Sequence, residues 1–456
     1  MGARKARSRG VNAKTMMGRR TAMNRREFLA AGGGVLLAGL PAVLPATPAA
    51  AQTSGARARI VIAGAGAAGL AMAARLSRGM PGATITIIDA KKEHHFQPGF
   101  TLVGAGLWSP ARVTERNADY MPRGVDWVEE AVAEFDPDAN AVVTTSGRRI
   151  DYDFLIVATG LKLDYTAIEG MDASLIGKEG IASIYAGPNE AAASAAAIDR
   201  FLETGGTGLF GRPAGEMKCA GAPLKITFIA DDKARRQGRR GAVELIYNAH
   251  GPAVFAVPPV NDKVKEMFAA RGVAVNYGHV LKAIDPGARR ATYRTEAGDV
   301  TLDYDFIHVV PPMRAPDAVR QSPLPWQEGN LAADGWVEAD KPTLRHPRYA
   351  NVFSVGDIAG VPRGKTAASV KWQVPVVADN LIAETAGRTP SATFNGYTSC
   401  PMVTGYGKAM LIEFDYDGTL IPSFPFIDPL KELWVSWLIE EKGLLGAYRA
   451  MLRGRA

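Results

Sequence analysis

The stretch RIVIAGAGAAG, residues 59–69, decides the fold of this chain. It starts with an apolar, β-branched run typical of a buried strand, and the residues after it have helical composition. Gly64 permits a tight turn, Gly66 lets a pyrophosphate approach the backbone, and Gly69 lets helix and strand pack closely. The N-terminus of the helix then offers unpaired N–H groups to phosphate. The stretch predicts the first strand–turn–helix of a dinucleotide-binding domain.

The next segment strengthens this interpretation. Thr84–Ile88 is a second β-branched strand that ends at Asp89, twenty residues after Gly69. An acidic side chain at that position is placed to accept hydrogen bonds from ribose hydroxyls. Strand, glycines, helix, strand and acid in this order are far more specific than the glycine spacing alone. We therefore expect a bound nucleotide cofactor.

Composition limits the class of protein, the partners and the kinds of site that the chain can have. The 456 residues are 47% apolar and 22% charged, which is typical of a globular protein with more than one domain. The formal net charge of +7 comes from residues 1–51, which hold nine Lys and Arg and one acid, while the rest is close to neutral. We expect no nucleic-acid partner. The two cysteines, Cys219 and Cys400, exclude a disulfide scaffold, and the scattered histidines give no metal spacing.

The N-terminal residues 1–51 resemble an export signal. Arg25-Arg26 precede Glu-Phe-Leu, a weakly apolar stretch follows over residues 30–44, and small residues at 49–51 form a cleavage pattern. This order predicts a twin-arginine signal peptide and a periplasmic location. The alternative is an N-terminal membrane anchor, which the prolines and glycines disfavour.

Two later segments identify the nucleotide. Tyr152–Gly160 looks like the strand and Ala-Thr-Gly segment of flavoproteins with two dinucleotide-binding domains, and Asn351–Asp357 looks like their late strand. In such proteins the aspartate of the late strand meets the ribityl chain of FAD. The cofactor-binding residues expected from these segments are Thr159, Gly160, Gly356 and Asp357.

Because these segments lie far apart, the FAD domain must be assembled from both ends of the chain. The predicted fold is α/β, with two Rossmann-like domains. The predicted divisions are an FAD domain of residues 52–168 and 336–392, a second domain of residues 169–335, and a C-terminal region of residues 393–456. The expected strands of the second domain are Leu224–Ala230, Ala242–Tyr247, Val273–Tyr277 and Asp305–Val310. The segment before the first of them lacks the glycine spacing, so no NAD(P)H site is expected.

Cys219 is the candidate nucleophile. Lys218 and Lys225 lie close to it in sequence, and nearby cations lower the pKa of a thiol and favour the reactive thiolate. The alternative is a buried structural cysteine, which is the usual state of an isolated one. The local sequence leaves both interpretations open.

From about residue 58 to the end, the chain resembles the sulfide:quinone oxidoreductases, the mitochondrial type above all. The segments that carry the resemblance are residues 96–106, 218–223, 309–313, 364–368 and 397–406. The resemblance implies one FAD, with sulfide oxidised on one face of the isoalloxazine ring and a quinone reduced on the other.

The resemblance implies the positions of the redox cysteines, and two further residues are candidates beside them. Cys219 matches one of the family's two redox cysteines, whereas the position after the Gly-Asp pair, expected to hold the other, is Ile358. The family's substrate is sulfide, and with Ile358 at this position another small thiol is the alternative substrate. Cys400 is interpreted as structural. Lys365 is a catalytic candidate near the N1–C2=O edge of the flavin, with a solvent-facing lysine as the alternative. Gln97 is expected to shape a backbone turn at the FAD.

The C-terminal region carries a possible membrane contact. Apolar residues stand at positions 430, 433, 434, 437 and 438, which is helical spacing, and lysines and arginines lie beside them. An interfacial helix with this pattern would bring the enzyme to a lipid-dissolved quinone at the inner membrane. The alternative is a helix that covers the core or forms a homo-oligomer contact.

Three functions are weighed. The leading one is oxidation of sulfide to sulfane sulfur, with electrons passed to a membrane quinone. The second is a periplasmic flavoprotein dehydrogenase subunit that passes electrons to a cytochrome partner. The third is a flavin-binding persulfide carrier or sensor that reduces no quinone.

Overall fold

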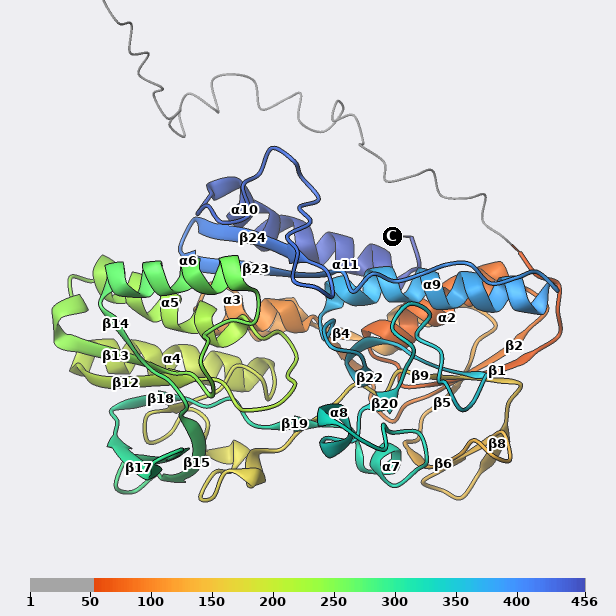
Figure 1. Ribbon diagram of the computed structural model, residues 1–456, viewed down its shortest axis with the longest axis horizontal. Helices are drawn as coiled ribbons and strands as arrows, with labels where there is room; N and C mark the ends of the chain where they lie inside the picture. Colours follow the sequence, from red (N-terminus) through yellow and green to blue (C-terminus); the bar gives the residue numbers. More distant parts are fainter. Residues whose placement is uncertain (1–52, 456) are drawn as a thin grey trace, which may run out of the picture. The chain divides into compact units, whose positions relative to one another are not determined.

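The computed structural model describes residues 53–455, which contain two five-stranded parallel sheets with helices packed around them (Figure 1). The predicted signal peptide, residues 1–51, lies outside the described residues. Within residues 53–455, no helix is both long enough and apolar enough to cross a bilayer, and no group of three or more His, Cys, Asp or Glu is arranged to hold a metal ion.

The first sheet has the strand order β21-β9-β1-β2-β5. Its strands are β1 (Arg59–Ala63), β2 (Thr84–Ile88), β5 (Asp126–Val128), β9 (Phe154–Val157) and β21 (Val352–Ser354). Every pair is parallel, and β21 adds to the edge of β9 although almost two hundred residues separate them. The predicted assembly of this sheet from both ends of the chain is therefore confirmed.

Two long helices cover one face of the first sheet. Helix α2 (Ala67–Gly79) follows β1, and helix α9 (Ala367–Thr385) packs against it. Thr366 begins α9 because its hydroxyl accepts a hydrogen bond from the main-chain N–H of Ser369, 3.1 Å away. The strands of this sheet are almost entirely apolar. This is expected for parallel strands that are covered on both faces.

The second sheet has the order β11-β18-β12-β13-β14, and it is also parallel. Its strands are β11 (Ile181–Ala182), β12 (Gly206–Gly211), β13 (Val243–Asn248), β14 (Val273–Asn276) and β18 (Phe306–His308). Its helices are α4 (Pro188–Thr204), α5 (Ala222–Arg236) and α6 (Pro258–Arg271). Three of the four expected strands of this domain are confirmed as β13, β14 and β18.

The fourth expected strand, Leu224–Ala230, is wrong, because these residues lie in helix α5. The segment is apolar on every side because this part of α5 is buried all round, and a buried helix then looks like a buried strand in sequence. Pro223 stands in the first turn of α5, where its missing N–H costs nothing. The strand that precedes α5 is β12, whose three glycines hide its strand character.

Small antiparallel sheets extend both halves. They consist of β6 (Val132–Asp136), β7 (Ala141–Thr144) and β8 (Arg149–Asp151), and of β15 (Val280–Asp285), β16 (Arg290–Thr295) and β17 (Gly298–Asp303). By their internal contacts, residues 52–456 form one unit, so the divisions at residues 168, 335 and 392 stay predictions.

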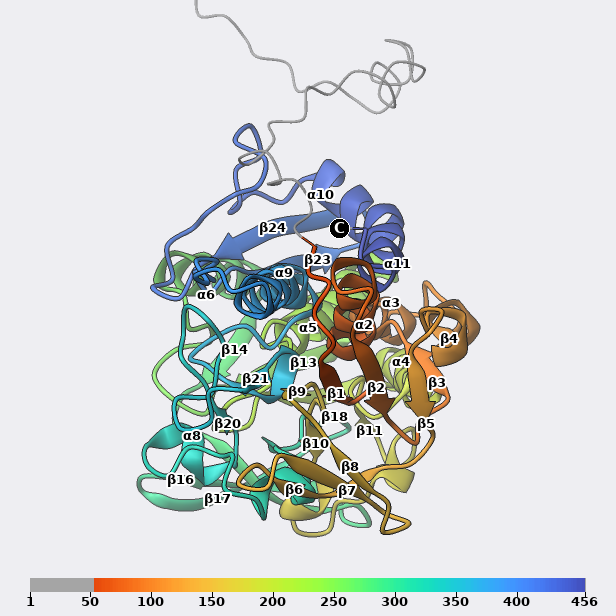
Figure 2. The ribbon, with the colours of Figure 1, turned by 90° about the vertical axis from the view of Figure 1, so that its right-hand side faces the viewer.

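The C-terminal region forms a separate layer over α5 and α9 (Figures 1 and 2). It consists of β23 (Thr398–Gly405), β24 (Lys408–Phe414), α10 (Trp434–Leu438), the π-helix Ile439–Gly443 and α11 (Leu444–Leu452). The apolar positions of the tail do not share one face. Trp437 is 6% exposed and packs on Tyr406, whereas Trp434 is 47% exposed. The expectation of one continuous interfacial stripe is therefore wrong, because α10 is short and half of it faces inward.

Candidate active site

The glycine turn after β1 packs tightly against the main chain at two of its glycines and is open at the third. Gly64 has φ +112°, and a Cβ there would lie 2.4 Å from the carbonyl oxygen of Ala158. A Cβ on Gly69 would lie 1.8 Å from the carbonyl oxygen of Gly64. A Cβ on Gly66 would meet nothing within 4 Å. The chain therefore needs glycine at two positions for its own packing, while Gly66 leaves room at the N-terminus of α2, where a pyrophosphate fits.

A cavity of about 550 Å³ begins at this turn. Four of the residues predicted to bind the cofactor line it, namely Gly64, Asp89, Gln97 and Thr159. The hydroxyl oxygen of Thr159 is buried and has no hydrogen-bond partner. A buried polar atom without a partner is costly, so this hydroxyl is suited to a polar group of a bound molecule. The cavity and its unpartnered donor fit FAD.

Asp89 also supports the turn itself. One carboxylate oxygen accepts a hydrogen bond from the main-chain N–H of Ala65 at 2.7 Å, and the other accepts one from Lys91 at 2.8 Å. Each carboxylate oxygen can accept a further hydrogen bond, so contact with a ribose stays a prediction for Asp89.

The late segments reach the same edge of the first sheet. Strands β9 and β21 are parallel neighbours, so Thr159-Gly160 and Gly356-Asp357 follow adjacent strand ends. Gly160 and Gly356 have φ of +68° and +77°, which favours glycine. The main-chain N–H of Gly356 donates to the side chain of Gln373 at 2.7 Å. Burial raises the pKa of Asp357, and the charges of nearby lysines oppose that rise.

Lys365 is buried beside this segment. Its ammonium donates to the carbonyl oxygens of Asp357 at 2.7 Å and Ala359 at 3.1 Å, and it lies 3.7 Å from the centre of the Trp336 ring. Burial lowers the pKa of Lys365 to about 8. The alternative of a solvent-facing lysine is therefore wrong, while its action on the flavin stays a prediction.

Cys219 is held in a strained conformation in the loop between β12 and α5. Its φ is +48°, which a side chain other than glycine rarely adopts. Its N–H donates to the carbonyl oxygen of Lys365 at 3.1 Å. Its carbonyl oxygen accepts hydrogen bonds from the hydroxyl of Tyr185 at 3.1 Å and from the N–H of Ala222 at 2.9 Å. These contacts fix the thiol in place, as is common for strained residues at functional sites.

Cys400, on β23, is hydrogen-bonded to Cys219 through the two thiols, which are both free. The contact depends on Gly221, because a Cβ there would lie 2.3 Å from the sulfur of Cys400. Tyr185 and Lys218 border the Cys219 loop and also line the 550 Å³ cavity. The structure therefore places a pair of thiols beside the cavity that fits FAD.

The two thiols have opposite pKa shifts. The hydrogen bond from Cys400, the charge of Lys225 and the N–H of Ala222 lower the pKa of Cys219 to about 6, against the effect of burial. The pKa of Cys400 is raised, because its proton is held by Cys219 and its sulfur is buried. These opposite shifts favour Cys219 as the thiolate and Cys400 as the thiol that donates to it.

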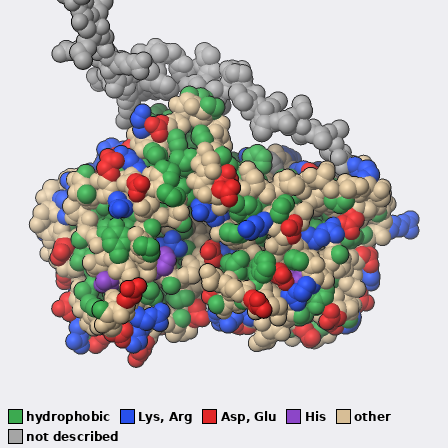
Figure 3. Space-filling model, in the orientation of Figure 1, with side chains coloured by type: hydrophobic (Ala, Val, Ile, Leu, Met, Phe, Trp, Pro, Cys, Tyr) green, Lys and Arg blue, Asp and Glu red, His purple; other side chains and the backbone are tan. Residues whose placement is uncertain are grey.

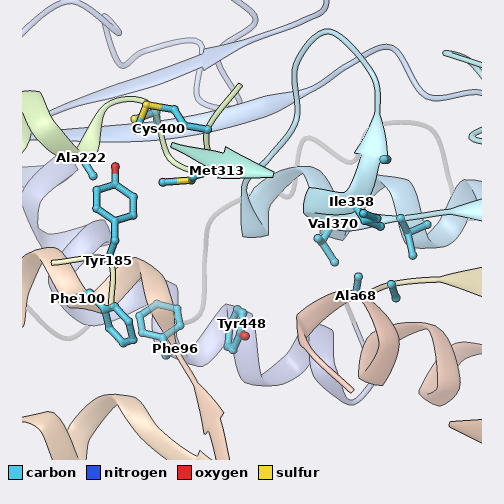
Figure 4. Close-up of a cluster of buried hydrophobic side chains, with 14 of the residues drawn as sticks. Ala68, Phe96, Phe100, Tyr185, Ala222, Met313, Ile358, Val370, Cys400 and Tyr448 are labelled. Carbon is cyan, nitrogen blue, oxygen red and sulfur yellow. The ribbon is translucent and has the colours of Figure 1, made fainter. Parts of the chain in front are cut away.

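The interpretation of Cys400 as purely structural missed this contact. In Figure 4, Cys400 lies near Met313 and Ala222, while Ile358, the position expected to hold a second redox cysteine, lies across the view beside Val370. The available signal was that the chain has only two cysteines. Their approach depends on the packing of β23 on α5, which no local motif reveals.

Comparison with known proteins agrees with this geometry. Residues 58–204 match the family model described as pyridine nucleotide-disulphide oxidoreductase. The chain is 37% identical to a protein of Dictyostelium discoideum named "Sulfide:quinone oxidoreductase, mitochondrial", over 87% of this chain and 86% of that protein. It is 35% identical to the protein of the same name from Mus musculus, over the same two shares.

The fold agrees as well. The crystal structure of the sulfide:quinone oxidoreductase from Aquifex aeolicus matches with a TM-score of 0.70 and 21% identity, covering 87% of this chain and 92% of that one. At that identity the match shows the fold alone. The identity to the eukaryotic relatives over most of both chains shows the family. This chain therefore belongs to the sulfide:quinone oxidoreductases and is an FAD-dependent oxidoreductase.

Proposed function

We propose that this protein oxidises sulfide to sulfane sulfur and passes the electrons to a membrane quinone, with Cys219 and Cys400 as its reactive pair. One observation carries the proposal. Two chain-distant thiols are hydrogen-bonded to each other beside the cavity that fits FAD, and a buried lysine stabilises one of them as a thiolate. The names of the relatives, sulfide:quinone oxidoreductase, agree with this chemistry.

FAD, when bound, supplies the two-electron acceptor between the sulfur chemistry and the quinone. Gly64, Asp89, Gln97 and Thr159 are the cavity residues that would hold it, and Gly66 leaves the phosphates room to reach the helix. Lys218 lines the same cavity and donates to the side-chain oxygen of Gln97 at 2.7 Å. This bond joins the side chain of Gln97 to the loop that carries both Lys218 and Cys219.

The first sulfur step uses the pair as a disulfide. Hydrosulfide attacks the sulfur of Cys400, the disulfide bond breaks, and its electron pair stays on Cys219. Cys400 becomes a persulfide and Cys219 a thiolate. This direction is favoured because the thiol with the lower pKa is the better leaving group, and that thiol is Cys219.

The second step regenerates the pair. An external nucleophile, either a second sulfide or a small thiol, attacks the outer sulfur of the persulfide and takes it, leaving Cys400 as a thiol. Oxidation of Cys219 thiolate and Cys400 thiol to the disulfide then releases two electrons and one proton. Those two electrons are the ones that the quinone finally receives.

The C-terminal region is the proposed membrane contact, on the periplasmic face of the inner membrane after export by the twin-arginine signal. Hydrophobic side chains gather on the upper lobe in Figure 3, over this region. The exposed apolar residues of the tail are Tyr406, Phe426, Trp434, Val435 and Leu438. Phe426 is 76% exposed, and large apolar side chains grouped on a surface are typical of interaction sites.

The deciding experiment is an anaerobic titration of the holoenzyme with sulfide, read at the flavin absorbance. We expect bleaching, followed by recovery of the absorbance when a short-chain ubiquinone is added. Recovery with a c-type cytochrome and not with the quinone would contradict quinone reduction. The absence of bleaching at any sulfide concentration would contradict sulfide oxidation altogether.

Membrane contact is tested separately by flotation with vesicles of anionic phospholipid. Replacing Phe426 and Trp434 together by Ser should remove most of the protein from the vesicle fraction and leave sulfide bleaching unchanged. The matched control is Trp372→Ser, another exposed tryptophan, which lies on α9. Equal flotation of all three proteins would contradict a contact through the tail.

A further inference from the structure

A buried carboxyl group lies close to the cysteine pair and has no part in the steps above. Glu440 belongs to the π-helix Ile439–Gly443, and its side chain is 2% exposed. Its Oε1 lies 4.0 Å from Nζ of Lys225, whose side chain is 3% exposed. Its Oε2 is buried without a hydrogen-bond partner. A buried ion pair with this poor geometry adds little stability, so it points to another role.

The charge of Lys225 acts on two acids. Cys219 in the loop before α5 and Glu440 in the C-terminal layer both interact with its charge, and Cys400 on β23 also senses it. On the π-helix itself, the neighbouring Glu441 turns away and pairs with Lys442 at 2.8 Å. Glu440 is therefore the one carboxyl group of this turn that faces the thiols.

The two acids share one cation, so the charge of one disfavours the charge of the other. Burial and the Cys219 thiolate together raise the pKa of Glu440 to about 7, while Lys225 opposes that rise. When Cys219 is bonded to another sulfur, its negative charge disappears. Of the groups that act on Lys225, Glu440 is then the one that can carry a negative charge. The ionised form of Glu440 therefore becomes favourable.

We propose that Glu440 compensates the charge of the cysteine pair through Lys225, being protonated while Cys219 is a thiolate and ionised while Cys219 is in a sulfur–sulfur bond. This is a positioning role that rests on the proposed function of the pair. The π-helix supports it, because widened turns of this kind are frequent at functional sites.

The proton balance of the sulfide step follows. Hydrogen sulfide gives one proton to ionised Glu440, and the hydrosulfide formed attacks Cys400. The disulfide bond breaks, and Cys219 leaves as the thiolate. Lys225 changes its partner from Glu440 to Cys219, so the net charge of the buried cluster stays the same. Re-oxidation of the pair reverses the exchange and releases the Glu440 proton together with the Cys400 proton.

The test measures how many protons accompany reduction of the pair. Holoenzyme is equilibrated in dithiothreitol redox buffers between pH 6 and pH 7, and the fraction of disulfide is found by trapping the thiols and mass spectrometry. We expect two protons per pair of electrons in the wild-type protein. Glu440→Gln should take up one, which halves the pH dependence of the midpoint potential. Glu441→Gln is the matched control and should keep the wild-type dependence.

A second readout needs no variant. Infrared difference spectra of reduced minus oxidised holoenzyme should show the carbonyl band of a protonated carboxyl group in the reduced form only. Equal pH dependence in the wild-type and Glu440→Gln proteins, absence of the band, or failure of the thiols to form a disulfide would overturn the role of Glu440. Neither measurement uses sulfide or quinone, so failure of sulfide to bleach the flavin would overturn the proposed function alone.

Discussion

The two parallel sheets place different chemistry at the same point of the fold. In the first sheet a short glycine turn joins β1 to α2, and the room at Gly66 suits the phosphates of a dinucleotide. In the second sheet a longer loop joins β12 to α5, and it carries Cys219 close to the N-terminus of the helix. A helix N-terminus stabilises negative charge in either case, whether on phosphate or on sulfur.

The comparison depends on what occupies the space beside one glycine in each half. Gly66 faces open space, whereas the space beside Gly221 is filled by the sulfur of Cys400. The first half therefore leaves room for a bound group, and the second half has two thiols in contact where a second nucleotide site would lie in a repeated fold.

The largest effect is expected from removing the sulfur of the second half. Cys219→Ser should lower the rate of sulfide-dependent flavin bleaching by several orders of magnitude, because the leaving group is lost. FAD content should stay the same, since the glycine turn of the first sheet is untouched. Stopped-flow absorbance measures the rate, and bleaching at the wild-type rate would contradict a role for this thiol.

Cys400→Ala sharpens the same point by leaving Cys219 in place. The hydrogen bond from Cys400 is the largest cause of the low pKa of Cys219, which is about 6. Without it, the pKa should rise, so the rate of alkylation of Cys219 by iodoacetamide should increase at a higher pH than in the wild-type protein. An unchanged pH profile would show that the thiol contact does not stabilise the thiolate.

The two glycines offer a matched pair with opposite outcomes. Gly66→Val fills the space at the helix N-terminus, so purified protein should lose most of its FAD while the second sheet stays intact. Gly221→Ala places a carbon 2.3 Å from the sulfur of Cys400, so the thiols should separate while FAD is kept. The absorbance spectrum measures the cofactor, and disulfide formation measures the pair. Loss of FAD in Gly221→Ala would break the comparison.

The sheets also differ in how charge stabilises them. Buried Asp231 on α5 pairs with three arginines, whereas Asp153 pairs with Arg59 at 2.8 Å at the exposed start of the neighbouring strands β1 and β9. Asp231→Asn takes the buried carboxylate from three partly exposed arginines and should cost about 1.5–3 kcal/mol. Asp153→Asn should cost about 1 kcal/mol or less. Urea unfolding of both variants measures the two losses, and equal losses would contradict this difference.

A last difference is a pH dependence that arises in the second sheet. Burial at the end of β18 lowers the pKa of His308 to about 3, from 6.5 in the exposed state. Acid therefore protonates His308 in the unfolded chain first, and stability is lost as the pH falls below 6.5, by up to about 1.4 kcal/mol per pH unit.

His308→Leu removes this titration. The urea midpoint of the variant should change less between pH 7 and pH 5 than that of the wild-type protein. The same fall in both proteins would show that other groups cause the acid sensitivity.

The first half of the molecule was more predictable from the sequence than the second. The glycine spacing at residues 64–69 is a local motif that predicts one structure, a strand followed by a tight turn and a helix. Both elements could therefore be predicted directly. β12 was missed because glycines make up half of it, and α5 was taken for a strand because its buried surface removes the helical period.

The candidate site shows the same difference between the two halves of the molecule. The residues that follow strand ends in the first sheet were found by motif, and three of them, Gly64, Asp89 and Thr159, line one cavity. The Cys219–Cys400 contact was missed because it is formed by tertiary packing of β23 on α5. For Lys365 the sequence left two alternatives open, and the structure excludes the solvent-facing one because its ammonium donates to the carbonyl oxygens of Asp357 and Ala359.

The edge position of β21 has a consequence for the order of assembly. Its three residues pair with β9 only after the chain has been synthesised beyond residue 354, and the Cys400 thiol arrives later still. Pairings between segments so distant along the chain form slowly. Neither the cofactor sheet nor the sulfur pair is complete until the chain has been made beyond these residues, so we expect flavin to be incorporated late in synthesis.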